Sequence, residues 1–471
     1  MMYLTGHSCS GTGTHCPAVA VAGLLLLTQM VFDVAFFSIN TVLVEENPAP
    51  PVAISLADRV PYGREPVDYF NTDTDDAVTK LGQRLTSGDA RLVADERFGY
   101  LLSVLQLLDV PLESQLLVYS KTARAPELVR PKTPRAIFFN DEVSVAWIPE
   151  SRELEITAAD PLKGINCYTL SQPLKTSASV TSSETRQDKV PTNDSAPLFQ
   201  RRTGCLACHA ARSSLEVPGL LLRTFQTDRT GKPIVGFSQV THDMKYEDRW
   251  GGWYVTGTPK NLIHQGNLVS EADNTQHRNE PGFASSLSDL AQKFEVDSYP
   301  FPASDIVAHL VMAHQSHGTN LLIRAGMESR LDRRSDVESR LLRYFVFADE
   351  PPLELSSADA AAVLRGSLFA SSFVARGPRD GDGKSLRDLS LDGRVFKHRL
   401  SFLIHSRLFD GLPEECRNRL LEKLWQGLTA ESADDDFRHL EKHERTQIVS
   451  IVRATVPRLP TCWGDGSTAR E

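Results

Sequence analysis

The sequence predicts an α+β fold, and changes in its hydrophobic period support that class. Apolar residues recur at three- and four-residue steps over residues 75–85 and 98–108, which is typical of amphipathic helices. From Pro134 the period changes to two, which is typical of strands. Beyond residue 301 the helical period returns. We therefore expect an N-terminal mixed α/β domain and a C-terminal helical region.

The mixed α/β domain is expected to span residues 50–170, after a proline-rich linker. Turn-like breaks around Asn140 and Pro149 separate its short apolar runs. The expected strands are residues 136–139, 143–148 and 154–157.

A polar segment, residues 171–198, follows this domain. It is rich in Ser and Thr and cannot bury enough apolar surface to order itself, so we expect a linker. Residues 199–267 are rich in Gly and aromatic side chains, which predicts irregular structure. The helical region is expected over residues 301–463, with helices at residues 304–324 (capped by Ser304-Asp305), 337–347, 414–428 and 441–455.

The N-terminus, residues 1–45, is interpreted as a signal peptide or an N-terminal anchor. Residues 17–27 are apolar, and the apolar character resumes after Gln29. Asp33 would cost roughly 2.5–3.5 kcal/mol near the centre of a bilayer span, which favours a short signal over an anchor. No Lys or Arg precedes this stretch, so a buried core helix is the alternative.

Composition excludes one class of partner. The formal net charge is −9 and no long basic run is present, so nucleic acid is not an expected ligand. The seven cysteines lack the dense spacing of a disulfide scaffold. Cys167, Cys416 and Cys462 are interpreted as buried small residues or free thiols.

Two cysteines and a histidine stand together in Gly-Cys-Leu-Ala-Cys-His, residues 204–209. Each thiol can add across one haem vinyl group, and Cys205 and Cys208 match the two vinyls if the segment turns as a helix. His209 would then supply an imidazole nitrogen to the iron. With 7 Cys and 13 His in the chain, this C-x-x-C-H signal arises by chance in about 3 of 1,000 chains. One covalent haem c is the expected cofactor.

Two other interpretations, a redox dithiol and a zinc site, fit this segment less well. A thioredoxin-like dithiol needs a strand before the motif, and the Ser/Thr-rich segment upstream does not predict one. A zinc site needs a second Cys/His pair, and the chain has no second CxxC.

The segment around Cys205, Cys208 and His209 is similar to the haem-binding segment of the cytochrome c family. The resemblance implies a mainly α-helical, monohaem region, here residues 199–300, that transfers electrons. A Val-Pro-Gly sequence at residues 217–219 follows at a distance similar to that family's Gly/Pro turn, whose carbonyl orients the proximal imidazole through its other ring N–H.

A second stretch, residues 249–257, resembles part of larger bacterial proteins that carry one such haem domain. Trp250, Trp253 and Tyr254 could pack on the macrocycle, with Arg249 pairing a haem propionate. The alternative is ordinary core packing of aromatic residues beside two glycines.

The sixth iron ligand is left open by the sequence. No Met lies at the spacing usual in small cytochromes, and His264 or His242 is the expected distal ligand, with Met244 as a third candidate. His314 and His317 share a helix face, a spacing that also suits a metal, but core or solvated histidines are the simpler interpretation.

A glycine-rich turn, Asp-Gly-Asp-Gly-Lys at residues 380–384, resembles the start of a calcium loop. It lacks the acidic residues needed at Lys384 and Leu391, so we expect a surface turn.

The expected function is an exported, periplasmic monohaem c-type cytochrome that exchanges electrons with a redox partner protein. The N-terminal segment would mediate any association with the membrane. The alternatives are a haem-dependent oxidoreductase with an open iron site, which would make the chain an enzyme, and a zinc-stapled binding protein. No catalytic residue is assigned.

Overall fold

The structure is a computed structural model, and it describes residues 59–173, 199–259, 261–269, 290–333, 335–432 and 434–464. Residues 54–471 group into one compact unit. The expected signal or anchor at residues 1–45 and nearly all of the expected linker at residues 171–198 lie outside the described residues.

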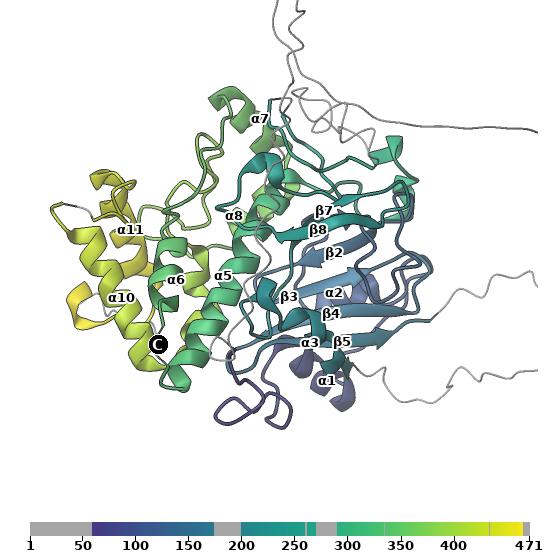
Figure 1. Cartoon of the computed structure of the whole chain (residues 1–471), viewed down its shortest axis with the longest axis horizontal. Coiled ribbons are helices and arrows are strands. Elements are labelled where there is room, and N and C mark those ends of the chain that lie inside the picture. The colour runs from purple at the N-terminus through teal and green to yellow at the C-terminus, as the bar shows by residue number, and fades with distance from the viewer. Residues whose placement is uncertain are drawn as a thin grey trace, which may run out of the picture. The chain divides into compact units, whose positions relative to one another are not determined.

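A seven-stranded antiparallel sheet forms the centre of this unit (Figure 1). Its order is β6-β5-β4-β3-β2-β1-β9, so strands β1 to β6 form a meander and β9 returns to the far edge. The strands are β1 (Leu116–Val118), β2 (Arg135–Phe139), β3 (Val143–Trp147), β4 (Glu153–Asp160), β5 (Gly164–Ser171), β6 (Gln200–Arg201) and β9 (Trp253–Tyr254). A separate hairpin pairs β7 (Arg223–Thr227) with β8 (Pro233–Gln239).

Other elements pack on both faces of the sheet; β5 is buried on both faces, whereas β3 and most of β4 alternate buried and partly exposed residues. One face packs against α1 (Ala77–Ser87) and α2 (Leu101–Leu107), where the core includes Leu117, Phe138, Leu154, Tyr168 and Leu170. The other face packs against α5 (Ile306–Arg330), where the core includes Leu116, Val118, Phe139, Ile165 and Cys167.

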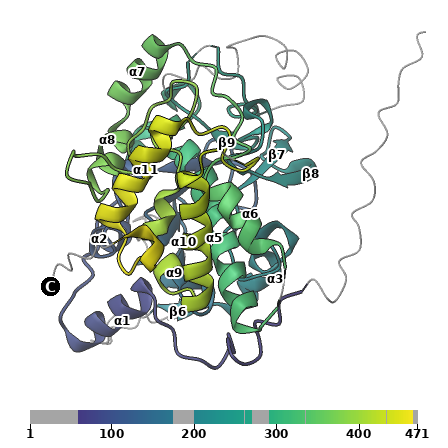
Figure 2. The same ribbon diagram turned by 90° about the vertical axis from the view of Figure 1, so that its left-hand side faces the viewer.

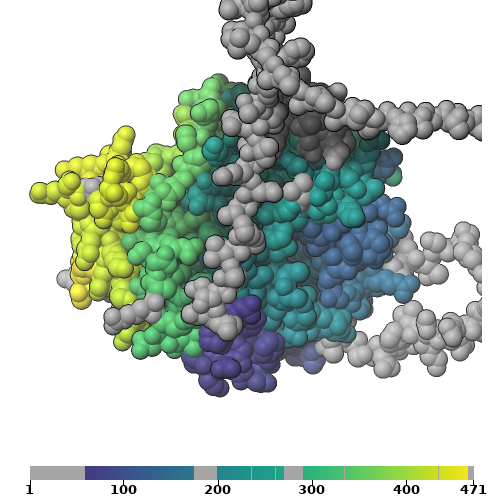
Figure 3. All heavy atoms as spheres, in the orientation of Figure 1, coloured from purple at the N-terminus to yellow at the C-terminus, as the bar shows by residue number. Residues whose placement is uncertain are grey.

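Helix α5 is the central element on that second face. Asp305 caps it by accepting a hydrogen bond from the Val307 amide, and Ser304 bonds instead to the Tyr254 carbonyl. Nearly all of its 25 residues are buried, as expected for a helix covered on every side. Figure 2 shows the C-terminal helices in front of α5, and in Figure 3 the green and yellow helical surface meets the teal and blue surface of the sheet. The helices that follow α5 in the chain are α6 (Val337–Phe345), α7 (Ser357–Gly366), α8 (Leu368–Ala375), α9 (Arg407–Asp410), α10 (Glu414–Thr429) and α11 (Lys442–Thr455).

The α+β class is confirmed, and so are most of the expected elements. Helices α1, α2, α5, α6, α10 and α11 and strands β2 to β4 lie within a few residues of their expected positions. Strand β5 was not expected, because it is buried on both faces and its sequence does not alternate.

Residues 199–300 differ from the mainly helical region that the resemblance implies. Among their described residues the α-helical segment is the four-residue α3 (Leu206–His209), and the rest is strands, 3-10 turns and loops. Strands β6 and β9 join the sheet of the first domain, and α5 covers it. Residues of the segments 50–170 and 199–300 therefore share one sheet, and α5 of the segment 301–463 packs against one of its faces.

None of the described helices alone has the length and apolar composition to cross a bilayer, and α7 with α8 meets that criterion only as a pair bent by 82°.

Two buried histidines of α5 make the stability of this core depend on pH. Burial lowers the pKa of His309 and of His314 from 6.5 to about 3. Both are neutral in the folded protein, whereas the unfolded chain binds protons below pH 6.5, so the free energy of unfolding falls as pH drops from 6.5 towards 3.

We predict that His309→Leu reduces this pH dependence. Each such histidine contributes up to about 1.4 kcal/mol per pH unit in that window, and the variant should lose one such contribution. Urea unfolding of both proteins between pH 6.5 and 4.5 measures the two slopes. Equal slopes would show that His309 is not held neutral by the fold.

Candidate functional site

The C-x-x-C-H segment forms one helical turn. A 3-10 turn, η3 (Thr203–Cys205), runs directly into α3 (Leu206–His209), and Cys205 has helical backbone angles, φ −65° and ψ −22°. Leu206 is buried and anchors the turn, Cys205 is half-buried, and Cys208 is exposed. The two thiols therefore stand three residues apart on a helix, which is the arrangement that attachment to two vinyl groups requires.

The turn is fastened to the edge of the central sheet. Strand β6 pairs with β5, with Tyr168 opposite Arg201. The Arg202 amide then donates to the Cys167 carbonyl at 2.8 Å, and its Nε donates to Thr169 Oγ1 at 2.9 Å. The helical turn starts at once after this edge strand, so β5 fixes its position.

The imidazole of His209 has a defined tautomer. Its Nδ1 lies 2.9 Å from the Gly219 carbonyl oxygen. A carbonyl can only accept, so Nδ1 carries the proton and the lone pair of the neutral ring is on Nε2. Burial lowers the pKa of His209, and the Gly219 carbonyl partly opposes that shift. No described residue makes a hydrogen bond to Nε2.

The loop that carries Gly219 is held from two sides. The Gly219 amide donates to the His209 carbonyl at 2.8 Å, and the Pro218 carbonyl accepts from the Ile165 amide of β5 at 2.9 Å. From α5, Asn320 bonds both main-chain groups of Leu220, at 2.7 and 3.0 Å. A Cβ at Gly219 would overlap Asn320 Oδ1, so the close approach of loop and helix requires glycine here.

The two cysteines lie in different surroundings. A hydrogen bond from the Cys167 thiol and the positive charge of Arg124 lower the pKa of Cys205 to about 6, although burial opposes them. Cys208 lies near the Arg223 guanidinium, which stacks 4.1 Å from the centre of the Phe237 ring. The lowered pKa of Cys205 favours its thiolate, the reactive form of cysteine.

The expected distal ligands already have hydrogen-bond partners. His264 is buried; its Nδ1 accepts from the Gly266 amide at 2.9 Å and its Nε2 lies 3.3 Å from Thr258 Oγ1. His242 is buried, and its Nδ1 lies 2.7 Å from Nδ1 of His314. Met244, the third candidate, packs against the α5 core.

The aromatic stretch over residues 249–257 belongs to the core in this structure. The Arg249 guanidinium is buried and donates to the main-chain carbonyls of His242, at 2.6 Å, and Met244. Trp253 Nε1 donates to the Arg223 carbonyl at 2.7 Å, and Trp250 packs edge-on against His264. These contacts favour the core-packing alternative over a role for Arg249 as a propionate partner.

The remaining candidates have structural contacts. His309 Nε2 donates to the Tyr254 carbonyl at 3.0 Å, and the His317 ring packs edge-on against Tyr344. Across the described part of the chain, no three His, Cys, Asp or Glu side chains are placed to hold a metal ion. Asp380 Oδ1 accepts from the amides at 382 and 384, which makes the expected surface turn.

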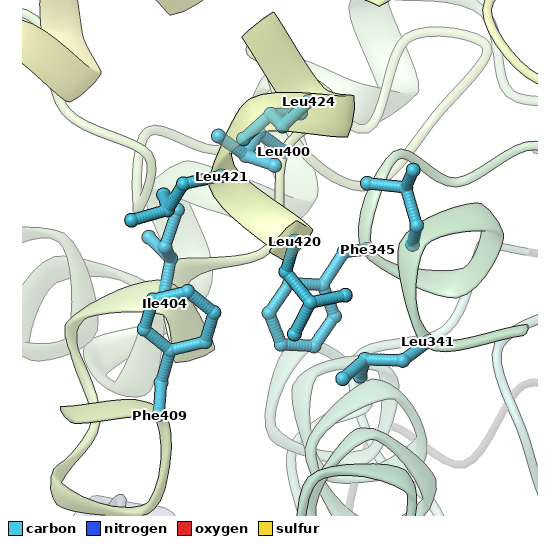
Figure 4. A pocket seen from close by; sticks show the side chains of 9 residues that line it. Leu341, Phe345, Leu400, Ile404, Phe409, Leu420, Leu421 and Leu424 are labelled. Atoms are coloured by element: carbon cyan, nitrogen blue, oxygen red, sulfur yellow. The ribbon is translucent and has the colours of Figure 1, made fainter. Parts of the chain in front are cut away.

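None of the described cavities is lined by residues of the C-x-x-C-H segment. The one in Figure 4 is apolar and measures about 10 Å³, room for no more than a water molecule; its walls are Leu341, Leu342, Phe345, Leu400, Ile404, Phe409, Leu420, Leu421 and Leu424. A polar cavity of about 140 Å³ lies beside His242 and His317, and another of about 300 Å³ lies beside Glu350. The C-x-x-C-H segment itself lies at the surface, with Ala207 and Cys208 exposed.

Three residues of the site carry no signal in the sequence. Cys167, Arg124 and Asn320 act on the C-x-x-C-H segment through the fold, from β5, from a loop and from α5. Comparison with family models, with curated proteins and with solved structures found no match to this chain.

We predict that Asn320→Ala loosens the Gly219 loop. The two Leu220 main-chain groups lose their partner, which should cost about 1–3 kcal/mol of unfolding free energy. Water should then reach the His209 ring and raise its pKa towards 6.5. Urea unfolding and an NMR titration of His209 measure the two effects.

The matched control is Asn261→Ala, since this exposed asparagine makes one similar hydrogen bond, to the Glu354 carbonyl at 3.0 Å, on another part of the surface. It should change neither quantity. A His209 pKa that stays the same in Asn320→Ala would mean that α5 does not position the imidazole.

Proposed function

We infer that the chain is a monohaem c-type cytochrome, with haem bound covalently through Cys205 and Cys208 and His209 as the axial iron ligand. The observation that carries this proposal is the hydrogen bond from His209 Nδ1 to the Gly219 carbonyl, 2.9 Å long, directly after two cysteines on one helical turn. This bond leaves Nε2 as the nitrogen with a free lone pair, which is what an iron ligand needs.

The surroundings of the thiols also support attachment. Thioether formation adds a sulfur to a vinyl carbon, and the depressed pKa of Cys205 supplies the nucleophilic thiolate. Cys208 is exposed and accessible. When bound, the haem would supply a one-electron iron couple, and the residues of this chain would hold and orient it.

An exposed aromatic ring near Cys208 fits the same proposal. Phe237 of β8 keeps 48% of its accessible surface and stacks on the Arg223 guanidinium, which interacts with Cys208. A macrocycle attached at Cys208 would have this ring available beside it.

The two alternatives fare differently. A zinc-stapled protein has no support in the described residues, because no set of three ligands is formed there. A haem oxidoreductase with an open iron site gains some support, because both ring nitrogens of His264 bond to other groups and the His242 ring is stacked on Tyr344. Export to the periplasm, a redox partner protein and membrane association through residues 1–45 belong to the proposal.

We predict that haem remains with the polypeptide on a denaturing gel. The chain is expressed with a haem-attachment system, and the gel is stained for haem peroxidase activity. Cys205→Ala with Cys208→Ala should abolish the stained band, and Cys416→Ala, which removes a buried thiol of α10, should keep it. A band of equal strength in the double variant would refute covalent attachment.

We predict that neither His242→Ala nor His264→Ala changes the spin state of the iron. His264 would have to break an internal hydrogen bond to bind iron, and the buried His242 ring is stacked against Tyr344 and Phe347. Optical spectra of the oxidised protein measure the spin state. A change to high spin in one variant would identify that histidine as the distal ligand, and carbon monoxide binding by the reduced wild type would indicate an open site.

A further inference from the structure

A third thiol lies beside the attachment site. Cys167 belongs to β5, keeps only 4% of its surface exposed and faces the α5 core. Cys205 packs against the same core. The two residues are far apart in the sequence, and the structure makes them neighbours.

The backbone explains why they meet. The pairing of β5 with β6 brings the Arg202 amide to the Cys167 carbonyl, at 2.8 Å. The Cys205 amide in turn donates to the Arg202 carbonyl at 3.3 Å, so Cys205 is one hydrogen-bonded turn away from Cys167. The η3 turn, which ends at Cys205, contacts β5, and the thiols of Cys167 and Cys205 influence each other electrostatically, while Cys208 is exposed.

We propose that Cys167 and Cys205 form a disulfide in the haem-free protein, and that this disulfide blocks haem attachment at Cys205. The block of haem attachment rests on the proposed function, whereas the disulfide does not. The two thiols would react with a disulfide oxidant, such as oxidised glutathione or a protein disulfide.

The chemistry is an ordinary thiol–disulfide exchange. The Cys205 thiolate attacks one sulfur of the oxidant, and the other sulfur leaves as a thiolate. Cys167 then loses its proton and attacks Sγ of Cys205, which releases the second half of the oxidant. The two protein thiols are oxidised by two electrons, and one oxidant disulfide becomes two thiols. Cys205 reacts first, because it is half-exposed and Cys167 is buried.

Peptide mapping tests the bond directly. The full chain, made without haem attachment, is incubated with oxidised glutathione, blocked with N-ethylmaleimide, digested and analysed by mass spectrometry. We expect a Cys167–Cys205 cross-link with Cys208 alkylated. A Cys205–Cys208 cross-link as the main product, or none at all, would overturn the proposal.

Variants separate this bond from general oxidation. Cys167→Ala, or Cys167→Val to keep a strand residue that fills the core, should lose the cross-link, and Cys416→Ala should keep it. Circular dichroism checks that each variant is folded. A Cys205 cross-link of unchanged yield to another cysteine in a folded Cys167 variant would also count against the proposal.

Haem attachment gives the second readout. Oxidised wild type, incubated with reduced haem in the absence of thiols, should take up no haem and show no haem stain. Cys167→Ala treated in the same way should take up haem and be stained. A stain of equal strength in oxidised and reduced wild type would refute the blocking role. If no protein takes up haem under any condition, the proposed function fails while the cross-link map still decides the disulfide.

Discussion

The hydrogen bond between His209 and the Gly219 carbonyl is the interaction on which the site depends. It selects the tautomer of the imidazole, and it requires the carbonyl to be held still. The residues on either side of Gly219 keep the carbonyl in place: Leu220 is hydrogen-bonded to Asn320, and Pro218 is hydrogen-bonded to Ile165. The conformation is costly in itself, because Leu215 and Glu216 both have left-handed backbone angles, with φ of 60°. Packing against α5 and β5 offsets that cost.

The site is therefore a product of the whole compact unit. The cysteines follow the edge strand β6, the carbonyl belongs to a loop, and the asparagine lies in the middle of the central helix. Helix α5 covers the sheet on the face where Cys167 points. The same helix thus supports the sheet, the Gly219 loop and the core beside Cys205.

The regular elements could be predicted because their patterns are local. The periods of α1, α10 and α11 and the alternation in β3 and β4 mark one buried face each, and the structure has that face. Strand β5 escaped prediction because both of its faces are buried. Residues 199–300 also differ from the mainly helical region that was expected. Strands β7 to β9 form there, because glycines and aromatic residues favour turns and strands.

The site could be predicted only where the motif is local. Spacing pointed to Cys205, Cys208 and His209, and the resemblance to the cytochrome c family pointed to the Gly turn; the structure brings His209 and Gly219 together. Cys167 and Asn320 could not be found, because their contacts depend on strand pairing and on the register of α5. His242 and His264 were expected from proximity in sequence, which does not show that each ring is tied to other buried groups.

Covalent haem is the central claim, and mass spectrometry of the attachment peptide tests it most directly. The protein is expressed with a haem-attachment system that loads a known c-type cytochrome, extracted with acidic acetone to remove free haem, and digested. The account predicts that the peptide with Cys205 and Cys208 carries the mass of one haem, with neither thiol open to alkylation. A peptide of unmodified mass, with both thiols alkylated, would contradict it.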